Sequence, residues 1–155
     1  MTDTVTPIFS HNPPAGAERR ARTRALVDKL LTERAQMLVL YCRVAGLAPY
    51  QSPEPVYELL DQFCQLLVDY VAAGHFGLYD RIANGTERRR EVAQLAGKIY
   101  PRIAETTERV VEFNDRYEAR LVEDPQSLSR DLSSLGEEIA QRVELEDQLI
   151  TAMLR

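Results

Sequence analysis

Apolar residues recur at intervals of three and four along most of the chain, which is the period of helices with one buried face. The first such segment runs from about Glu18 to Ala45. Its stripe comprises Val27, Leu31, Ala35, Leu38, Cys42 and Ala45. Gly46 and Pro49 follow it, and a glycine with a downstream proline commonly ends a helix. The pattern therefore predicts a long first helix.

Three more helices follow, each introduced by a residue that can cap a helix. Ser52, Thr86 and Asp124 precede them, and Asn84-Gly85 separates the second from the third. Their apolar stripes include Leu59, Leu60, Phe63, Leu67 and Tyr70, then Val92, Ile99, Ile103, Val110 and Phe113, then Leu128, Leu132, Leu135, Ile139 and Ile150. Pro101 falls inside the third helix and cannot donate a hydrogen bond to residue 97, so we expect a kink or a local break there.

Four long amphipathic segments with short connections are typical of an antiparallel four-helix bundle. No segment alternates with a period of two, so the sequence predicts an all-α fold without a sheet. Residues 1–17 lack periodic apolar positions and contain Pro13-Pro14, which favours a flexible N-terminal tail. We expect residues 18–155 to form one helical bundle domain.

The composition is that of an ordinary globular domain, with 45% hydrophobic and 28% charged residues in 155. The longest apolar runs are too short to cross a bilayer, and no export leader opens the chain, so we expect no membrane partner. Cys42 and Cys64 lack CxxC spacing, which favours a reducing compartment. These features predict a cytoplasmic protein.

The charge is acidic overall and unevenly distributed. A net charge of −5 argues against nucleic acid as a direct partner. Residues 19–43 hold seven basic and two acidic side chains, whereas residues 105–147 hold thirteen acidic side chains and five arginines. Two interpretations remain: solvated helix faces, or an acidic surface that attracts a basic partner.

The sequence contains no pattern that indicates an enzyme. A di-iron bundle needs Glu-x-x-His pairs, and no Glu lies three residues before His11 or His75. The two cysteines are too far apart in sequence for a zinc site, and neither common phosphate-binding glycine motif occurs. A Cys64–His75 nucleophile pair is less consistent with the pattern than simple packing of Cys64. We therefore expect no catalytic residues, no metal site and no cofactor.

The segment from Asp69 to Asp80 contains glycines and a mixed polar and aromatic face that the packing of a buried helix does not require. Two glycines inside a helix cost about 1 kcal/mol each relative to alanine. In a regular helix Asp69, Ala72, Phe76 and Tyr79 share one face, with a carboxylate and two aromatic rings around a small residue. This face is either a docking site for another protein or, if Phe76 points inward, a part of the core.

A second unusual segment is Glu144-Leu145-Glu146-Asp147. The stripe of the last helix places Glu146 or Asp147 beside its apolar face. A carboxylate there needs a partner, which is either an arginine of a neighbouring helix or a bound protein. We retain Glu146 and Asp147 as acidic residues that support docking.

At these segments the chain resembles the regulator of sigma D family, the Rsd/AlgQ anti-sigma factors of proteobacteria. The most specific stretch is residues 61–76, DQFCQLLVDYVAAGHF, supported by Lys98-Ile99-Tyr100-Pro101 and by residues 145–150, LEDQLI. Family members often carry tryptophan at the positions of Leu30 and Tyr100, and some carry serine at that of Ala72. This chain contains no tryptophan.

The resemblance implies a helical bundle that binds the C-terminal, −35-recognising domain of the housekeeping sigma factor and sequesters it from core RNA polymerase. It also implies that Asp69, Ala72 and Phe76 contact sigma, with His75 and Tyr79 as neighbours. The alternative is a signalling adaptor bundle whose main partner is a metabolic regulator such as a phosphocarrier protein.

Overall fold

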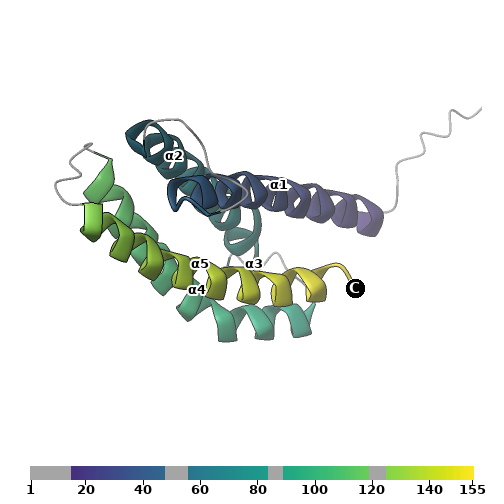
Figure 1. Ribbon diagram of the computed structural model, residues 1–155. Coiled ribbons are helices and arrows are strands. Elements are labelled where there is room, and N and C mark those ends of the chain that lie inside the picture. The colour runs from purple at the N-terminus through teal and green to yellow at the C-terminus, as the bar shows by residue number, and fades with distance from the viewer. Residues whose placement is uncertain (1–14, 48–55, 84–88, 119–124) are drawn as a thin grey trace, which may run out of the picture.

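A computed structural model describes residues 15–47, 56–83, 89–118 and 125–155 of the chain. Within these ranges four long helices and no strand are present: α1 (Ala15–Val44), α2 (Val56–Gly74), α4 (Arg90–Tyr117) and α5 (Pro125–Met153). A π-helical turn, η1 (His75–Tyr79), and a short helix, α3 (Asp80–Ala83), continue α2 without interruption. The all-α prediction is confirmed (Figure 1).

Neighbouring helices run in opposite directions, as residue pairs across each interface show. Between α1 and α2, Tyr41 packs on Phe63, and Leu30 lies against Gly74. Between α4 and α5, Arg116 pairs with Asp131 at one end, whereas Arg142 reaches Ile103 farther along. Figure 1 shows α4 and α5 side by side beneath α1. The described helices therefore form the expected antiparallel bundle.

The core lies along the axis of the bundle and contains a line of aromatic rings. Tyr41, Phe63, Phe113 and Tyr117 form successive ring contacts with centroids 4.6–6.0 Å apart, which join α1, α2 and α4. The fully enclosed side chains of the core include Val27, Leu30, Met37, Leu59, Leu67, Tyr70, Leu78 and Leu149. Aromatic contacts of this kind add about 0.5–1.5 kcal/mol each beyond the area that they bury.

The buried face of α1 is offset from the predicted stripe by about one residue. Thr23, Val27, Leu30, Met37, Leu40 and Val44 are buried, whereas Ala35 and Ala45 are exposed. Leu31 and Leu38 pack at the edge of the core. The sequence has two adjacent apolar rows here, and the row with the larger side chains points inward because it removes more apolar surface from water.

Helix α4 runs from Arg90 to Tyr117 without interruption, with Pro101 inside it. A local break at Pro101 is therefore wrong, while the kink stays a prediction. Ile99 and Ile103 are both buried on either side of the proline, so the packing of the two flanking turns keeps the helix continuous.

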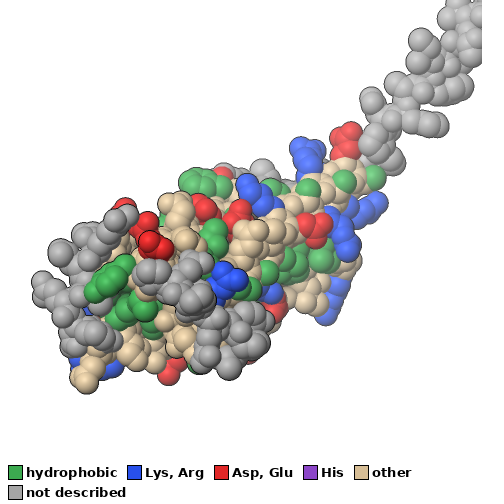
Figure 2. Space-filling view, turned by 45° about the horizontal axis from the view of Figure 1, so that its top comes forward, with side chains coloured by type: hydrophobic (Ala, Val, Ile, Leu, Met, Phe, Trp, Pro, Cys, Tyr) green, Lys and Arg blue, Asp and Glu red, His purple; other side chains and the backbone are tan. Residues whose placement is uncertain are grey.

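The predicted N-terminal tail falls largely outside the described residues, which begin at Ala15. Helix α1 starts there, three residues before the expected Glu18. Figure 2 shows Lys and Arg side chains gathered around this N-terminal end of α1, in agreement with the uneven charge of the sequence. The division of the chain at residue 17 stays a prediction.

Candidate functional site

The segment predicted to be a docking face contains the one π-helical turn in the described part of the chain. Residues His75–Tyr79 adopt this conformation between α2 and α3. A π turn holds about one residue more than an α turn, and such turns occur often at functional sites. The sequence pattern predicted an uninterrupted α-helix here, because the spacing of its apolar residues does not distinguish the two.

A groove of about 360 Å³ lies between α1 and this turn. Its lining residues are Leu26, Lys29 and Glu33 of α1 and Asp69, Ala72, Ala73, Phe76 and Gly77 of the α2–η1 segment. Phe76 is 73% exposed, more than any other large hydrophobic side chain that the structure describes. The interpretation of Phe76 as a core residue is therefore wrong.

The groove brings together three of the five residues predicted for docking: Asp69, Ala72 and Phe76. Asp69 accepts a hydrogen bond of 3.2 Å from the Nε2 atom of Gln65, one turn earlier on α2. His75 is exposed next to the groove, with its ring edge-on to Phe76 at a centroid distance of 4.9 Å.

Tyr79 does not lie on this face, so that part of the prediction is wrong. Its side chain is 3% exposed, and its hydroxyl lies 3.3 Å from Oε2 of Glu146 in the interior. The prediction assumed a regular α-helix from Asp69 to Tyr79. The extra residue of the π turn rotates Tyr79 away from Phe76 and toward the core.

Directly behind the groove a polar network is enclosed in the bundle. Arg142 and Glu146, one turn apart on α5, are 1% and 0% exposed and form an ion pair of 3.3 Å. Tyr70 and Tyr79 donate hydrogen bonds to Glu146. The guanidinium of Arg142 also donates to the hydroxyls of Thr106 and Thr107 on α4, at 3.0 and 2.8 Å, and lies over the rings of Tyr70 and Tyr79.

This network satisfies the charges that the fold encloses. Burial, and then the neighbouring carboxylate of Glu146, raise the pKa values of Tyr70 and Tyr79 above their ordinary value, so both hydroxyls stay protonated and act as donors. Gly74 leaves room for the network, because a Cβ atom there would lie 3.2 Å from Tyr79 and 3.4 Å from Arg142. The side chain of Arg142 therefore limits the size of the residue that position 74 can hold on the inward side of the α2–η1 segment.

The acidic pair of α5 has internal partners. Glu146 is enclosed, so its assignment as a residue that supports docking is wrong. Asp147 is 55% exposed and pairs with Arg34 of α1 at 2.8 Å, and the same Arg34 lies 3.6 Å from Glu146. Of the two alternatives for these carboxylates, the structure shows the internal arginine. Glu146 is buried because it lies on the same face of α5 as Ile139 and Arg142, and this face packs into the bundle.

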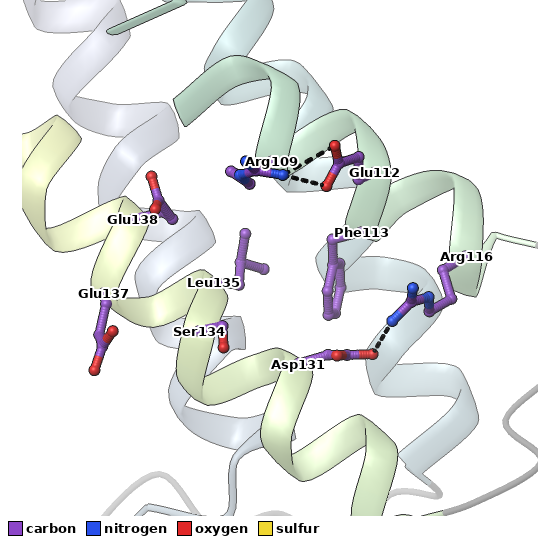
Figure 3. A pocket seen from close by; sticks show the side chains of 9 residues that line it. All are labelled: Arg109, Glu112, Phe113, Arg116, Asp131, Ser134, Leu135, Glu137 and Glu138. Atoms are coloured by element: carbon purple, nitrogen blue, oxygen red, sulfur yellow. Dashed lines mark hydrogen bonds and ion pairs between the residues drawn. The ribbon is translucent and has the colours of Figure 1, made fainter. Parts of the chain in front are cut away.

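A second hollow, of about 320 Å³, lies between α4 and α5, with Phe113 and Leu135 at its base (Figure 3). Most of its rim charges have ion-pair partners: Arg109 pairs with Glu112 at 2.9 Å, Arg116 with Asp131 at 2.8 Å, and Glu138 with Arg102 at 3.0 Å. Glu137 forms no ion pair with another described residue. Partial burial would raise the pKa of Asp131, but hydrogen bonds from Tyr117 and Arg116 lower it.

The α1–α2 groove differs from this hollow in its charges. Lys29, Glu33 and Asp69 line the groove, and none of them forms an ion pair with another described residue. Three unpaired charges beside an exposed aromatic ring favour a partner molecule more than a rim whose charges are mostly paired. We therefore take the α1–α2 groove as the candidate protein-binding site.

Neither metal chemistry nor membrane insertion is indicated by the described residues. No group of three or more His, Cys, Asp or Glu side chains in them could hold a metal ion. No helix in the described part of the chain is both long and apolar enough to cross a bilayer.

Comparison with known proteins shows the family of the chain. The family model described as regulator of RNA polymerase sigma(70) subunit, Rsd/AlgQ, matches residues 14–154. The chain belongs to the Rsd/AlgQ family. It is 36% identical over 138 residues to the regulator of sigma D of Yersinia enterocolitica, with 86% of this chain and 83% of that protein covered. It is 35% identical over 143 residues to the regulator of sigma D of Shigella boydii, with 88% and 89% covered.

Leu30 and Tyr100 contact residues on the inward side of the α2–η1 segment. Leu30 is 1% exposed and lies against Gly74. Tyr100 is partly exposed, with its ring 6.2 Å from that of Tyr79.

Sequence reasoning missed the α1 wall of the groove and the buried Arg142. Leu26, Lys29 and Glu33 follow a spacing of three and four, which places them on one face, but their mixed chemistry resembles a solvated surface. Arg142 precedes Glu146 by four residues, a spacing that usually indicates an exposed pair. Its burial could not be recognised without the positions of the other helices.

Proposed function

We propose that this protein binds the C-terminal domain of the housekeeping, sigma(70)-type sigma factor and keeps it from core RNA polymerase. Membership of the Rsd/AlgQ family over residues 14–154 supports sigma as the partner, as do relatives named regulator of sigma D. The family description is that of a regulator and names no reaction. Because RNA polymerase works in the cytoplasm, the same proposal places the protein there.

The exposure of Phe76 is the observation that best supports this location of the binding site. A ring that is 73% exposed keeps a large apolar surface in water, which is unfavourable unless a partner covers it. Asp69 and Ala72 line the same groove and offer a hydrogen-bond acceptor and a small residue beside the ring. An aromatic anchor with a nearby polar group is a common arrangement at the centre of protein interfaces.

Charge supports the same partner. A domain that reads the −35 element through a helix-turn-helix carries basic side chains that would otherwise meet DNA phosphates. The present chain has a net charge of −5, with thirteen acidic residues between positions 105 and 147. Its field therefore attracts such a domain and accelerates encounter, while burial around Phe76 supplies affinity.

Calorimetric titration of the isolated C-terminal sigma domain into the full chain tests the proposal. We expect saturable binding that weakens as salt concentration rises. In a second measurement, added chain should reduce the amount of full-length sigma that co-elutes with core polymerase in gel filtration. Absence of binding to the sigma domain would contradict the proposal.

A pull-down from cell lysate separates this function from the adaptor alternative. The expected eluate contains the housekeeping sigma factor, and Phe76→Ala should reduce its amount. An eluate dominated by a phosphocarrier protein and free of sigma would favour the adaptor function.

A further inference from the structure

Helices α2 and α4 run antiparallel, and two pairs of aromatic rings define their register. Phe63 contacts Phe113 near one end of the interface, at a centroid distance of 6.0 Å. Tyr79 contacts Tyr100 near the other end, at 6.2 Å. Tyr100 therefore lies on the side of α4 that faces α2. Val111 follows it by about three helical turns and so lies on the same side.

The outer edge of this interface is apolar and exposed. Val68 of α2 lies between the two ring pairs and is 41% exposed, as is Tyr100, and Val111 is 50% exposed. We call the surface formed by these three residues the α2–α4 seam. The seam is separate from the candidate protein-binding site, because α1 packs on the other side of α2, where the groove lies. A strip of large apolar side chains in water favours contact with another molecule.

One end of the seam is bordered by carboxylates from both helices. Burial, and then the charges of Asp61 and Glu118, raise the pKa of the Cys64 thiol. Cys64 lies one turn before Val68 on α2, so Asp61 of α2 and Glu118 of α4 both lie near this end of the seam.

The remaining charges beside the seam are also acidic. Glu108 and Asp115 are exposed about one turn on either side of Val111. Helix α2 contains no lysine or arginine. The arginines in this part of α4 face α5 instead, where two pair with carboxylates of that helix and the third lines the hollow; they are Arg102, Arg116 and Arg109. The seam therefore combines an apolar strip with an acidic border, which fits a basic partner.

The first turns of α1 form a basic surface of this kind. Arg20, Arg22 and Arg24 are exposed and form no ion pair with another described residue. Arg20 and Arg24 lie on the same side of α1 as the buried Val27, yet this end of the helix extends beyond α2 (Figure 1). Cations at a helix N-terminus oppose the helix dipole, so these arginines do not stabilise α1.

The two surfaces are complementary in their chemistry. Arg20 and Arg24 are one turn apart with the exposed Ala21 between them, so their methylene groups form an apolar face that can cover the valines of the seam. Their guanidinium groups can stack on the ring of Tyr100 and pair with the acidic border. Because the seam and α1 lie on opposite sides of α2, the α1 end cannot reach the seam of its own chain.

We propose that the α2–α4 seam binds the basic N-terminal end of α1 from a second copy of this chain, so that copies associate head to tail. Each copy has one seam and one α1 end, so the contact is heterologous and association can continue beyond a dimer. The local attraction opposes a repulsion between net charges of −5, which makes the association weak. This inference does not depend on the proposed function.

Sedimentation velocity of the full chain from about 10 µM to about 1 mM tests the association. We expect the average mass to rise with concentration in low salt and to fall toward that of the monomer as salt is added. Val111→Glu in the seam and Arg24→Glu in the α1 end should each weaken association about tenfold or more. Ala140→Glu and Lys98→Glu make the same changes of charge at exposed positions outside both surfaces, and should stay within about twofold of wild type.

A mixture of the two weakened variants tests the head-to-tail arrangement. The Val111→Glu chain keeps an intact α1 end, and the Arg24→Glu chain keeps an intact seam. An equimolar mixture should therefore form a 1:1 dimer with wild-type affinity, although each variant alone stays monomeric. Circular dichroism should show the same helix content in both variants as in wild type, because both positions are exposed.

A wild-type chain that stays monomeric at about 1 mM in low salt overturns the inference, as does association that strengthens with salt. Wild-type association of Arg24→Glu, which would indicate contact of seam with seam, also overturns it. So does a mixture that fails to form the dimer, or an equal loss in Ala140→Glu. A loss in Phe76→Ala as large as that in Val111→Glu would place the second copy in the α1–α2 groove and overturn the assignment to the seam. Titration with the sigma domain tests the proposed function separately from all of these outcomes.

Discussion

Replacement of Phe76 by alanine gives the most direct measurement of the proposed interface. A fully enclosed phenylalanine buries at least about 150 Å², and the ring of Phe76 is 73% exposed. A partner that covers most of this surface removes roughly 100 Å² from water, worth about 2.5 kcal/mol at 25 cal/mol per Å². Alanine keeps a small part of that contact, so Phe76→Ala should cost about 2 kcal/mol, or roughly thirtyfold in Kd.

The same substitution should leave the fold intact. The side chain of Phe76 is mainly in water, and its ring contact in the structure is with the exposed His75. Truncation of a surface residue without core contacts changes the free energy of unfolding by about 0.5 kcal/mol or less. A loss of binding in Phe76→Ala therefore reports on the interface and not on unfolding.

Titration calorimetry with the isolated sigma domain measures the change in affinity, and urea denaturation followed by circular dichroism measures the change in stability. Tyr57→Ala is the matched control, because Tyr57 is also on α2, is 53% exposed and lies outside the groove. Its affinity should equal that of wild type. A folded Phe76→Ala variant that binds as tightly as wild type would refute the placement of the site, as would an equal loss in Tyr57→Ala.

Three further predictions concern the interior. Arg142→Met removes the enclosed cation 3.3 Å from Glu146 and leaves only Arg34, at 3.6 Å, beside that carboxylate, so it should lower the free energy of unfolding in urea by about 3 kcal/mol; a loss below about 1 kcal/mol would contradict the network. Gly136→Ala should destabilise by about 1–2 kcal/mol, because its Cβ would lie 2.9 Å from Cζ of Tyr41, and a Tyr41→Phe background should reduce that loss. Burial raises the pKa of Cys64 from 9.0 to about 12, so a thiol reagent at pH 8 should leave Cys64 unmodified in the native chain and label it in urea. Since the unfolded thiol loses its proton first, stability should fall as pH rises from about 9 to 12, and Cys64→Val should flatten this slope.

The α2–η1 segment could be predicted closely from its spacing as far as Phe76, the second residue of the π turn. Asp69, Ala72 and Phe76 follow one another at three and four residues, and the structure brings all three to one groove. The prediction was wrong at Tyr79, because a π turn intervenes and the sequence carries no periodic signal for it. A rule based on helical spacing holds as long as the number of residues per turn stays constant.

The burial of Arg142 could not be predicted from the sequence for a different reason. An arginine is seldom fully buried, so sequence reasoning assigned the arginines of residues 105–147 to the surface charge. Its enclosure depends on Glu146, one turn later on α5, and on two partners far away in sequence, the Thr106–Thr107 pair and Tyr70. No local pattern specifies such a meeting, whereas the apolar stripes that bring these helices together are visible at once.

Residues 69–79 face the groove on one side and the buried ion pair on the other. The two sides therefore have different roles, although the family resemblance covers both. Tyr70, Gly74 and Tyr79 point inward to the buried ion pair, and the close approach of Arg142 explains the glycine at position 74. Asp69 and Phe76 line the groove outside. A residue of this motif can therefore be required for packing without touching a partner. We propose that the outward residues, together with α1, carry the sigma contact, and the contribution of α1 becomes visible only when the two helices are packed.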